Sequence, residues 1–122
     1  INQNEDYYYI NSMDNNFPKN IEIVEGDFIK YDKKSLYLDK DQLKFPLKIR
    51  KWNKGDYIYP TGMNGKKLLS KIFKDKKFSI YEKSTQCILE DSEHILWVIG
   101  IRFDKRKYMK ANVNFKISLI EN

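Results

Sequence analysis

The sequence predicts an α+β domain, with a mixed, mostly antiparallel sheet and one or two helices. Strand-like segments outnumber helical ones, which favours an architecture based on β-sheet. Several of these segments alternate apolar and polar residues, as strands with one buried face do. One segment, at about 65–77, instead has apolar residues at the spacing of an amphipathic helix. The 122 residues, 41% of them hydrophobic, suit a single domain with one modest core.

The first half of the chain contains short strand-like segments separated by polar residues. Strands are expected at 7–10, 21–26, 28–31, 35–39 and 47–52. The strand at 28–31 would pair with the one at 21–26, and the polar stretch 11–20 would form a loop. Segment 47–52 alternates, so Leu47 and Ile49 would be buried while Arg50 and Trp52 lie on the opposite face.

The second half predicts the helix and the central strands. Residues 55–60 are expected to be extended, and Thr61 or Asn64 would cap a helix that begins near Gly65. In that helix the apolar stripe and the lysines lie on opposite sides; the stripe is Leu68, Leu69, Ile72 and Phe73, and the lysines are Lys67, Lys71 and Lys74. Strands follow at 86–90, 94–103 and 114–120, the first two joined by a tight turn.

Positive charge is concentrated in the middle of the chain. The net charge is +6, yet residues 48–83 hold eleven Lys or Arg and only three Asp or Glu. Residues 1–47 hold six and nine, and residues 84–122 hold six and five. Such a localised excess favours a surface that binds a polyanion such as nucleic acid.

The residues needed for metal or nucleophilic chemistry are scarce. Cys87 and His94 are the only residues of their types, so a disulfide, a metal site and a catalytic triad are not expected. Asp56 lies among lysines and is expected to form an ion pair. The longest apolar run, 95–101, is too short to span a bilayer. We therefore expect no catalytic residue and no cofactor in this chain, which opens at Ile1 and is expected to be part of a longer protein.

Two basic segments are candidates for phosphate binding. Gly62 and Gly65 would let the backbone approach a ligand, and amides at a helix start beside Lys66 and Lys67 would bind phosphate. The alternative is a plain connecting turn followed by a solvated helix face. In the second segment, 102–108, Arg102 and Arg106 can make bidentate phosphate contacts, and Asp104 can orient an arginine.

Aromatic residues lie among these cations. Trp52, Tyr57 and Tyr59 could stack on exposed bases, or they could belong to the core, as aromatic residues in strands more often do.

The region 46–108 resembles the C-terminal domain of bacterial tRNA(Ile)-lysidine synthases, the TilS family. The matching motifs are PL-x-IR, GD-x-x-x-P-x-GM-x-G-x-K and W-V-x-G-x-R-x-D-x-R, in that order. The resemblance implies a fold similar to a module of the phenylalanyl-tRNA synthetase beta subunit (a PheT/TilS-like domain). It also implies a parent ligase that uses ATP, with Mg²⁺, to attach lysine to the wobble cytidine of the isoleucine tRNA that reads AUA. That chemistry belongs to an N-terminal domain, and the C-terminal domain binds tRNA around the acceptor stem.

The resemblance also indicates individual residues. The predicted tRNA-binding residues are Arg50, Lys66, Lys67, Arg102 and Arg106, to which the charge pattern adds Lys51, Lys54, Lys71, Lys74 and Lys107. The loop frame would consist of Gly55, Asp56, Pro60, Gly62 and Gly65. The sequence departs from the family pattern at Lys71, where aspartate is frequent, and at Ser79, where proline is usual.

The whole chain, 1–122, is therefore interpreted as one C-terminal tRNA-binding domain. It would comprise leading strands and a loop at 1–33, a family-like core at 34–110 and a final strand at 111–122. The expected partners are tRNA(Ile) and the rest of a cytoplasmic enzyme, with no membrane; homodimer formation is left open. The alternatives are a protein–protein or self-association module with a basic face, or a small enzyme that uses Asp56 or Ser70.

Overall fold

The computed structural model describes residues 7–10 and 21–120, and the loop expected at 11–20 lies outside this part. The elements in chain order are β1 Tyr7–Ile10, β2 Ile21–Glu25, β3 Leu36–Leu38, the 3-10 helix η1 Lys40–Gln42, β4 Leu47–Lys51, β5 Tyr57–Ile58, β6 Lys67–Leu68, α1 Leu69–Asp75, α2 Ile80–Thr85, β7 Cys87–Glu90, β8 Ile95–Val98, β9 Arg102–Phe103 and β10 Phe115–Leu119. None of the helices among these residues is long and apolar enough to cross a membrane.

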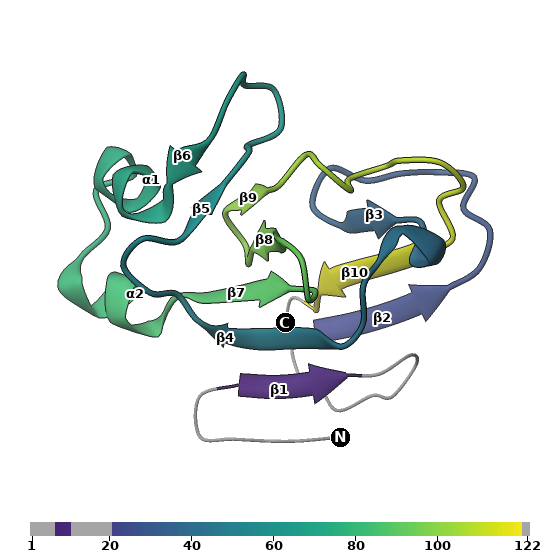
Figure 1. The fold of residues 1–122 in the computed structure, drawn as a ribbon, viewed down its shortest axis with the longest axis horizontal. Helices are drawn as coiled ribbons and strands as arrows, with labels where there is room; N and C mark the ends of the chain where they lie inside the picture. The colour runs from purple at the N-terminus through teal and green to yellow at the C-terminus, as the bar shows by residue number, and fades with distance from the viewer. Residues whose placement is uncertain (1–6, 11–20, 121–122) are drawn as a thin grey trace.

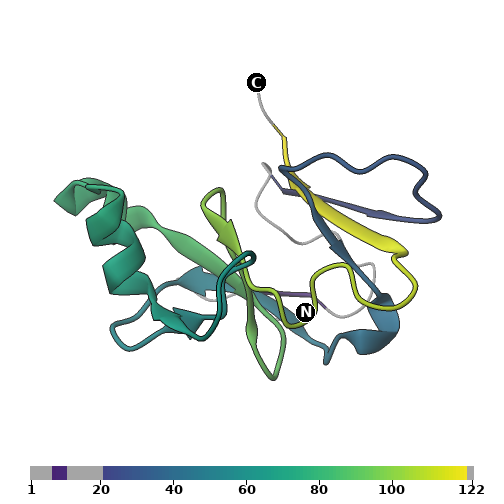
Figure 2. The ribbon, with the colours of Figure 1, turned by 90° about the horizontal axis from the view of Figure 1, so that it is seen from above.

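The strands form two sheets and a short ribbon, as Figure 1 shows. The larger sheet has the order β1-β4-β7-β8-β9, the smaller has the order β2-β10-β3, and β5 pairs with β6. Every pairing between described strands is antiparallel. Viewed from above, the β8–β9 hairpin lies between the helices and the smaller sheet (Figure 2). The predicted α+β class is therefore confirmed.

Two predicted strands differ from the structure. Residues 28–31 form no strand, and β2 instead pairs with β10, with Ile23 opposite Ile117. Segment 94–103 is not one strand but the β8–β9 hairpin, because a turn in which the Ile101 N–H donates to the Val98 carbonyl reverses the chain. Gly100 has a φ of +80°, which glycine adopts without steric cost and which explains why the apolar run bends there.

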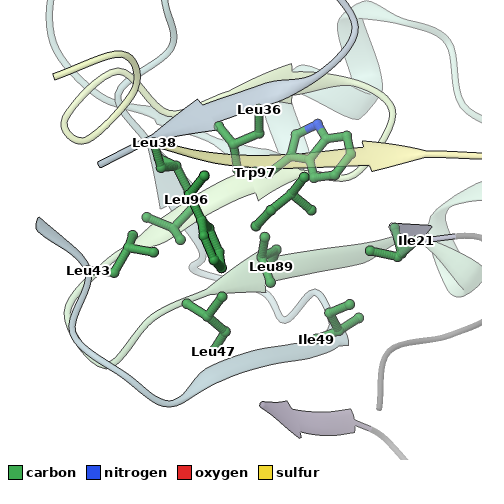
Figure 3. Close-up of a cluster of buried hydrophobic side chains, with 11 residues drawn as sticks. Ile21, Leu36, Leu38, Leu43, Leu47, Ile49, Leu89, Leu96 and Trp97 are labelled. Atoms are coloured by element: carbon green, nitrogen blue, oxygen red, sulfur yellow. The ribbon is translucent and has the colours of Figure 1, made fainter. Parts of the chain in front are cut away.

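Two apolar clusters stabilise the fold. The first fills the space between the two sheets, where Leu36 and Leu38 of β3 face Leu47 and Leu89 of the larger sheet (Figure 3). The second joins α1 to the larger sheet. Burying one such side chain contributes about 1.5–3 kcal/mol, so these clusters account for most of the driving force that holds the elements together.

The predicted helix at 65–77 is shorter than expected. It begins at Leu69, and residues 67–68 form β6, with Leu68 opposite Tyr57. Neither Thr61 nor Asn64 caps it, since its N-cap position is Leu68 and no side chain caps it there. Leu68 is 49% exposed, whereas the rest of the predicted stripe, Leu69, Ile72 and Phe73, is buried.

A second short helix, α2, begins just after Ser79. The Ser79 hydroxyl accepts a hydrogen bond from the Glu82 N–H, and the Glu82 carboxylate accepts one from the Ser79 N–H. This reciprocal capping box satisfies two helix-end donors. The serine found where the family usually has proline therefore supports an ordered helix start.

Candidate nucleic-acid interface

The β5–β6 hairpin loop, residues 59–66, is attached to the segment that follows β9. The Tyr59 N–H donates to the Asp104 carboxylate at 2.8 Å, and the Lys105 N–H donates to the Tyr59 carbonyl at 2.8 Å. The Thr61 N–H donates to the Phe103 carbonyl at 3.2 Å. The fold thus brings together the two basic segments, more than forty positions apart, that the sequence singled out.

The glycines of this loop shape a turn and do not begin a helix. Gly62 and Gly65 have φ values of +79° and +77°, which residues with a side chain rarely adopt. Because α1 starts only at Leu69, and the Leu69 N–H donates to the Asp56 carbonyl, the expected phosphate site at a helix start beside Gly65 is not formed.

Five of the predicted cations are exposed near α1. The buried side of α1 packs against the larger sheet, and Trp52 makes an edge-to-face contact with Phe73, with ring centroids 4.9 Å apart. These contacts place the segments that carry the lysines at the same end of the molecule (Figure 1). We call this surface the α1 end; its residues are Lys51, Lys54, Lys66, Lys71 and Lys74. None of the five forms an ion pair with a described residue.

Arg50, by contrast, is neutralised by the protein itself. Its guanidinium donates to both oxygens of Asp56, at 2.9 and 3.1 Å, and to Glu90 at 3.0 Å. Burial alone would lower the pKa of Arg50, but the hydrogen bonds and charges of these two carboxylates raise it. Arg50, which was predicted to bind tRNA, is therefore held by two carboxylates of the protein, and the expectation that Asp56 forms an ion pair is confirmed.

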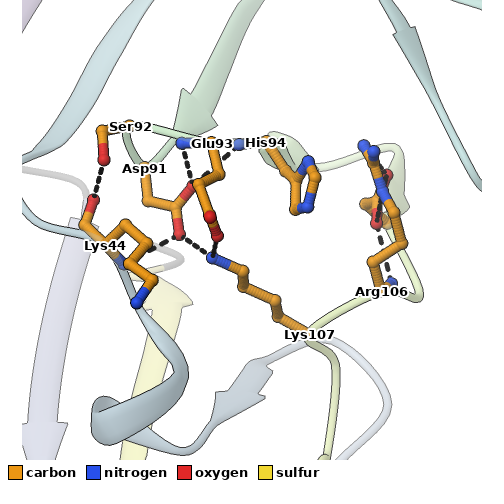
Figure 4. A network of polar contacts seen from close by, with 8 residues as sticks. Lys44, Asp91, Ser92, Glu93, His94, Arg106 and Lys107 are labelled. Carbon is orange, nitrogen blue, oxygen red and sulfur yellow. Dashed lines mark hydrogen bonds and ion pairs between the residues drawn. The ribbon is translucent and has the colours of Figure 1, made fainter.

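Two of the predicted lysines are also paired. The Lys107 ammonium contacts the carboxylates of Asp91 and Glu93 (Figure 4), and its side chain is only 10% exposed. Lys107 was expected on the basic surface and instead belongs to a buried network, because Asp91 needs a counter-charge there. Lys67 contacts Asp75 at 2.6 Å in a partly exposed pair, which lowers the pKa of Asp75.

Arg106 lies against two tyrosines. Its guanidinium is 4.5 Å from the ring centroid of Tyr59 and 5.9 Å from that of Tyr57, and it also pairs with Asp104 at 2.8 Å. The Lys66 ammonium lies 4.6 Å from the Tyr57 centroid. Cation–π contacts of this kind contribute about 0.5–1 kcal/mol at exposed sites. Asp104 orients an arginine, as the sequence suggested.

Trp52 and Arg102 have other surroundings. The Trp52 indole N–H donates to the Lys83 carbonyl at 2.6 Å, so this ring belongs to the core around α1 and is not a free stacking platform. Arg102 donates to the carbonyl of Thr61 in the 59–66 loop, and Arg106 lies over Tyr59 of the same loop. The two arginines, four positions apart, thus line different grooves.

Two grooves contain the predicted arginines, and their charges differ. The first, of about 410 Å³, contains Arg50 and Arg106 but also Asp56, Glu90 and Asp91, so its cations are balanced by acids. The second, of about 630 Å³, is lined by basic residues from three segments and a single carboxylate, that of Asp32. Pattern reasoning missed this second groove, since Lys33 and Lys116 are far apart in sequence and meet only in the fold. No group of three His, Cys, Asp or Glu side chains within the described ranges could hold a metal ion.

Whether any of these side chains contacts RNA stays a prediction. What the geometry establishes is which of the ten predicted cations have no carboxylate partner among the described residues: the five of the α1 end and Arg102.

Comparison with known proteins places the chain in a family. The family model of the TilS substrate C-terminal domain matches residues 47–118. The tRNA(Ile)-lysidine synthase of Parabacteroides distasonis is 45% identical over 85 residues, which is 69% of this chain and 19% of that protein. The synthase of Bacteroides thetaiotaomicron is 42% identical over 78 residues, 64% of this chain and 18% of that protein.

A solved structure has the same fold. The crystal structure of a TilS C-terminal domain superposes with a TM-score of 0.72 at 21% identity, covering 95% of this chain and 99% of that one. The chain spans about a fifth of the length of the curated relatives that it matches. On the ordered motifs, the family match and the shared fold, this chain belongs to the family of TilS substrate C-terminal domains.

Proposed function

We propose that this chain is the non-catalytic tRNA-binding domain of a tRNA(Ile)-lysidine synthase and contacts the acceptor stem. The observation that carries the proposal is the α1 end, whose five lysines are exposed on segments at one end of the molecule (Figure 1) and lack ion-pair partners among the described residues. The names of the relatives indicate tRNA(Ile) as the binding partner. We assign the ligase reaction, with the ATP and Mg²⁺ that the family resemblance implies, to the remainder of the parent protein.

Exposed lysines suit a double-stranded RNA stem. The major groove of A-form RNA is too narrow for side chains, so a protein reads the stem by its shape and its phosphate positions. Each phosphate that a lysine neutralises releases counterions, and the affinity then falls steeply with salt. Weak binding by the domain would still help the whole enzyme, because it raises the effective concentration of tRNA at a distant active site.

The test is a titration of the 122-residue chain with tRNA(Ile) at about 50 and 200 mM salt. The Lys66→Ala/Lys71→Ala variant should bind more weakly, and its slope of log K against log salt should be shallower by about one unit per lysine. Lys44→Ala/Lys110→Ala, which removes two exposed lysines outside the α1 end, is the matched control.

Three outcomes would contradict the proposal. They are an absence of binding, an affinity indifferent to salt, and an equal loss in the control variant. Salt-indifferent association with protein would favour the self-association alternative.

A further inference from the structure

The second groove lies between the β8–β9 hairpin and the smaller sheet, which Figure 2 shows side by side. We call it the β9–β10 groove and define it by Lys33, Arg102 and Lys116 around Trp97 and Asp32. Its volume of about 630 Å³ is within the range of small-molecule and nucleotide sites. Thr61 also lines the groove, and Thr61 belongs to the 59–66 loop, which contains Lys66 of the α1 end.

The single carboxylate of the groove is already engaged. Asp32 accepts hydrogen bonds from the Ser35 hydroxyl at 3.0 Å, the Tyr37 hydroxyl at 3.0 Å and the Lys34 N–H at 2.9 Å. The Lys116 ammonium lies 3.6 Å from it, a long ion pair. Asp32 therefore offsets one of the positive charges, and the groove keeps a net positive charge.

Arg102 keeps its charge and most of its donors. Among the described residues its only hydrogen bond goes to the Thr61 carbonyl, and it forms no ion pair with any of them. A guanidinium has five N–H donors in a fixed fork, which matches the oxygens of a phosphate. The carbonyl contact fixes the side chain without neutralising it, unlike Arg50 and Arg106, which are held by acids.

We infer that the β9–β10 groove binds a phosphate of an RNA backbone, with Arg102 as the forked donor and Lys33 and Lys116 as flanking charges. The choice of RNA over a free nucleotide rests on the proposed function. Because Thr61 of the groove and Lys66 of the α1 end belong to one loop, the backbone of a single tRNA would contact the α1 end and the groove together.

The test uses the Lys33→Gln/Lys116→Gln variant and amide NMR of the wild-type chain. Binding of tRNA(Ile) to the variant should weaken several-fold, with a salt slope shallower by about one unit per lysine. The amides of residues 33, 102 and 116 should shift when tRNA is added. Lys44→Gln/Lys110→Gln is the charge-matched control, and Arg102→Lys, which keeps the charge but loses the fork, should also weaken binding.

The outcomes separate this inference from the proposed function. If Lys33→Gln/Lys116→Gln binds tRNA as tightly as wild type does while Lys66→Ala/Lys71→Ala binds it more weakly, the inference about the groove is overturned and the proposal for the α1 end stands. The reverse result supports the groove and overturns the α1 end. The assignment to RNA is overturned if the control variant loses as much tRNA affinity as the groove variant. It is also overturned if AMP shifts the same amide signals and binds as tightly as tRNA does. Failure of the wild-type chain to bind tRNA overturns both.

Discussion

Replacing Lys107 with methionine is expected to lower the free energy of unfolding at pH 7 by about 3 kcal/mol. The side chains of Lys107 and Asp91 are 10% and 0% exposed, so Lys107→Met would leave a buried carboxylate without its counter-charge. Breaking such a pair costs about 3–5 kcal/mol. The lower end applies because the N–H groups of Lys44, Glu93 and His94 still donate to Asp91, and because methionine preserves much of the apolar stem.

The pH dependence of this loss tests its electrostatic origin. Burial alone would raise the pKa of Asp91, but Lys107 and the backbone N–H groups lower it below its ordinary value. A depressed pKa in the folded state contributes stability above the unfolded pKa of about 4, and this stability is lost as the pH falls through the folded value. Lys107→Met raises the folded pKa of Asp91. The difference between wild type and variant should therefore shrink as the pH falls from the raised pKa to the depressed one.

Urea unfolding, followed by the fluorescence of Trp52 and Trp97, measures both effects at pH 7 and pH 4. Lys110→Met, which changes an exposed lysine in the same way, should alter stability by no more than about 0.5 kcal/mol. A loss below about 1 kcal/mol for Lys107→Met, or one that does not change with pH, would refute the reasoning.

Two further predictions concern α2 and Arg50. Ser79→Ala removes the capping box with Glu82 and should lower stability by about 1 kcal/mol, measured by thermal unfolding; a change within error would mean that the cap contributes nothing. Arg50→Met leaves Asp56 and Glu90 without their shared partner, and should lower the free energy of unfolding by about 1–3 kcal/mol while changing tRNA affinity less than about twofold. A tenfold loss of affinity in a folded Arg50→Met variant would show that this arginine leaves its carboxylates to bind RNA.

Local sequence patterns predicted the strands and helices whose burial follows from the spacing of apolar residues within the segment itself. In β4, Leu47 and Ile49 are buried as the alternation indicated, and in α1 the stripe from Leu69 to Phe73 faces the core. The loop glycines also follow from local requirements, since a positive φ at Gly62 needs no distant partner.

Patterns failed where a distant segment decided the structure. Residues 28–31 look like a strand, yet β2 finds its partner in β10, and Ile29 remains 94% exposed. Leu68 fits the helical stripe, but pairing with Tyr57 draws it into β6. In each case the tertiary partner outweighs the local preference, as is common for short strands.

Charge counting overstated the number of cations that have no carboxylate partner. Four of the ten predicted cations, namely Arg50, Lys67, Arg106 and Lys107, are paired with carboxylates, and the partner Glu90 of Arg50 lies forty positions away. A pairing over that distance leaves no trace in the local charge balance. The predicted cations that lack a carboxylate partner are instead divided between the α1 end and the β9–β10 groove.

This division has a mechanical consequence. The loop is joined to β9 and the segment after it by hydrogen bonds that involve Tyr59, Thr61 and Lys105, so the α1 end and the β9–β10 groove are connected through these contacts. Two charged surfaces held at a set spacing discriminate between polyanions by shape, because only a backbone that reaches both gains the counterion release of each. A rigid stem meets that condition with less loss of conformational entropy than a flexible single strand does. Under the proposed function, the arrangement would favour structured RNA without requiring any contact to a base.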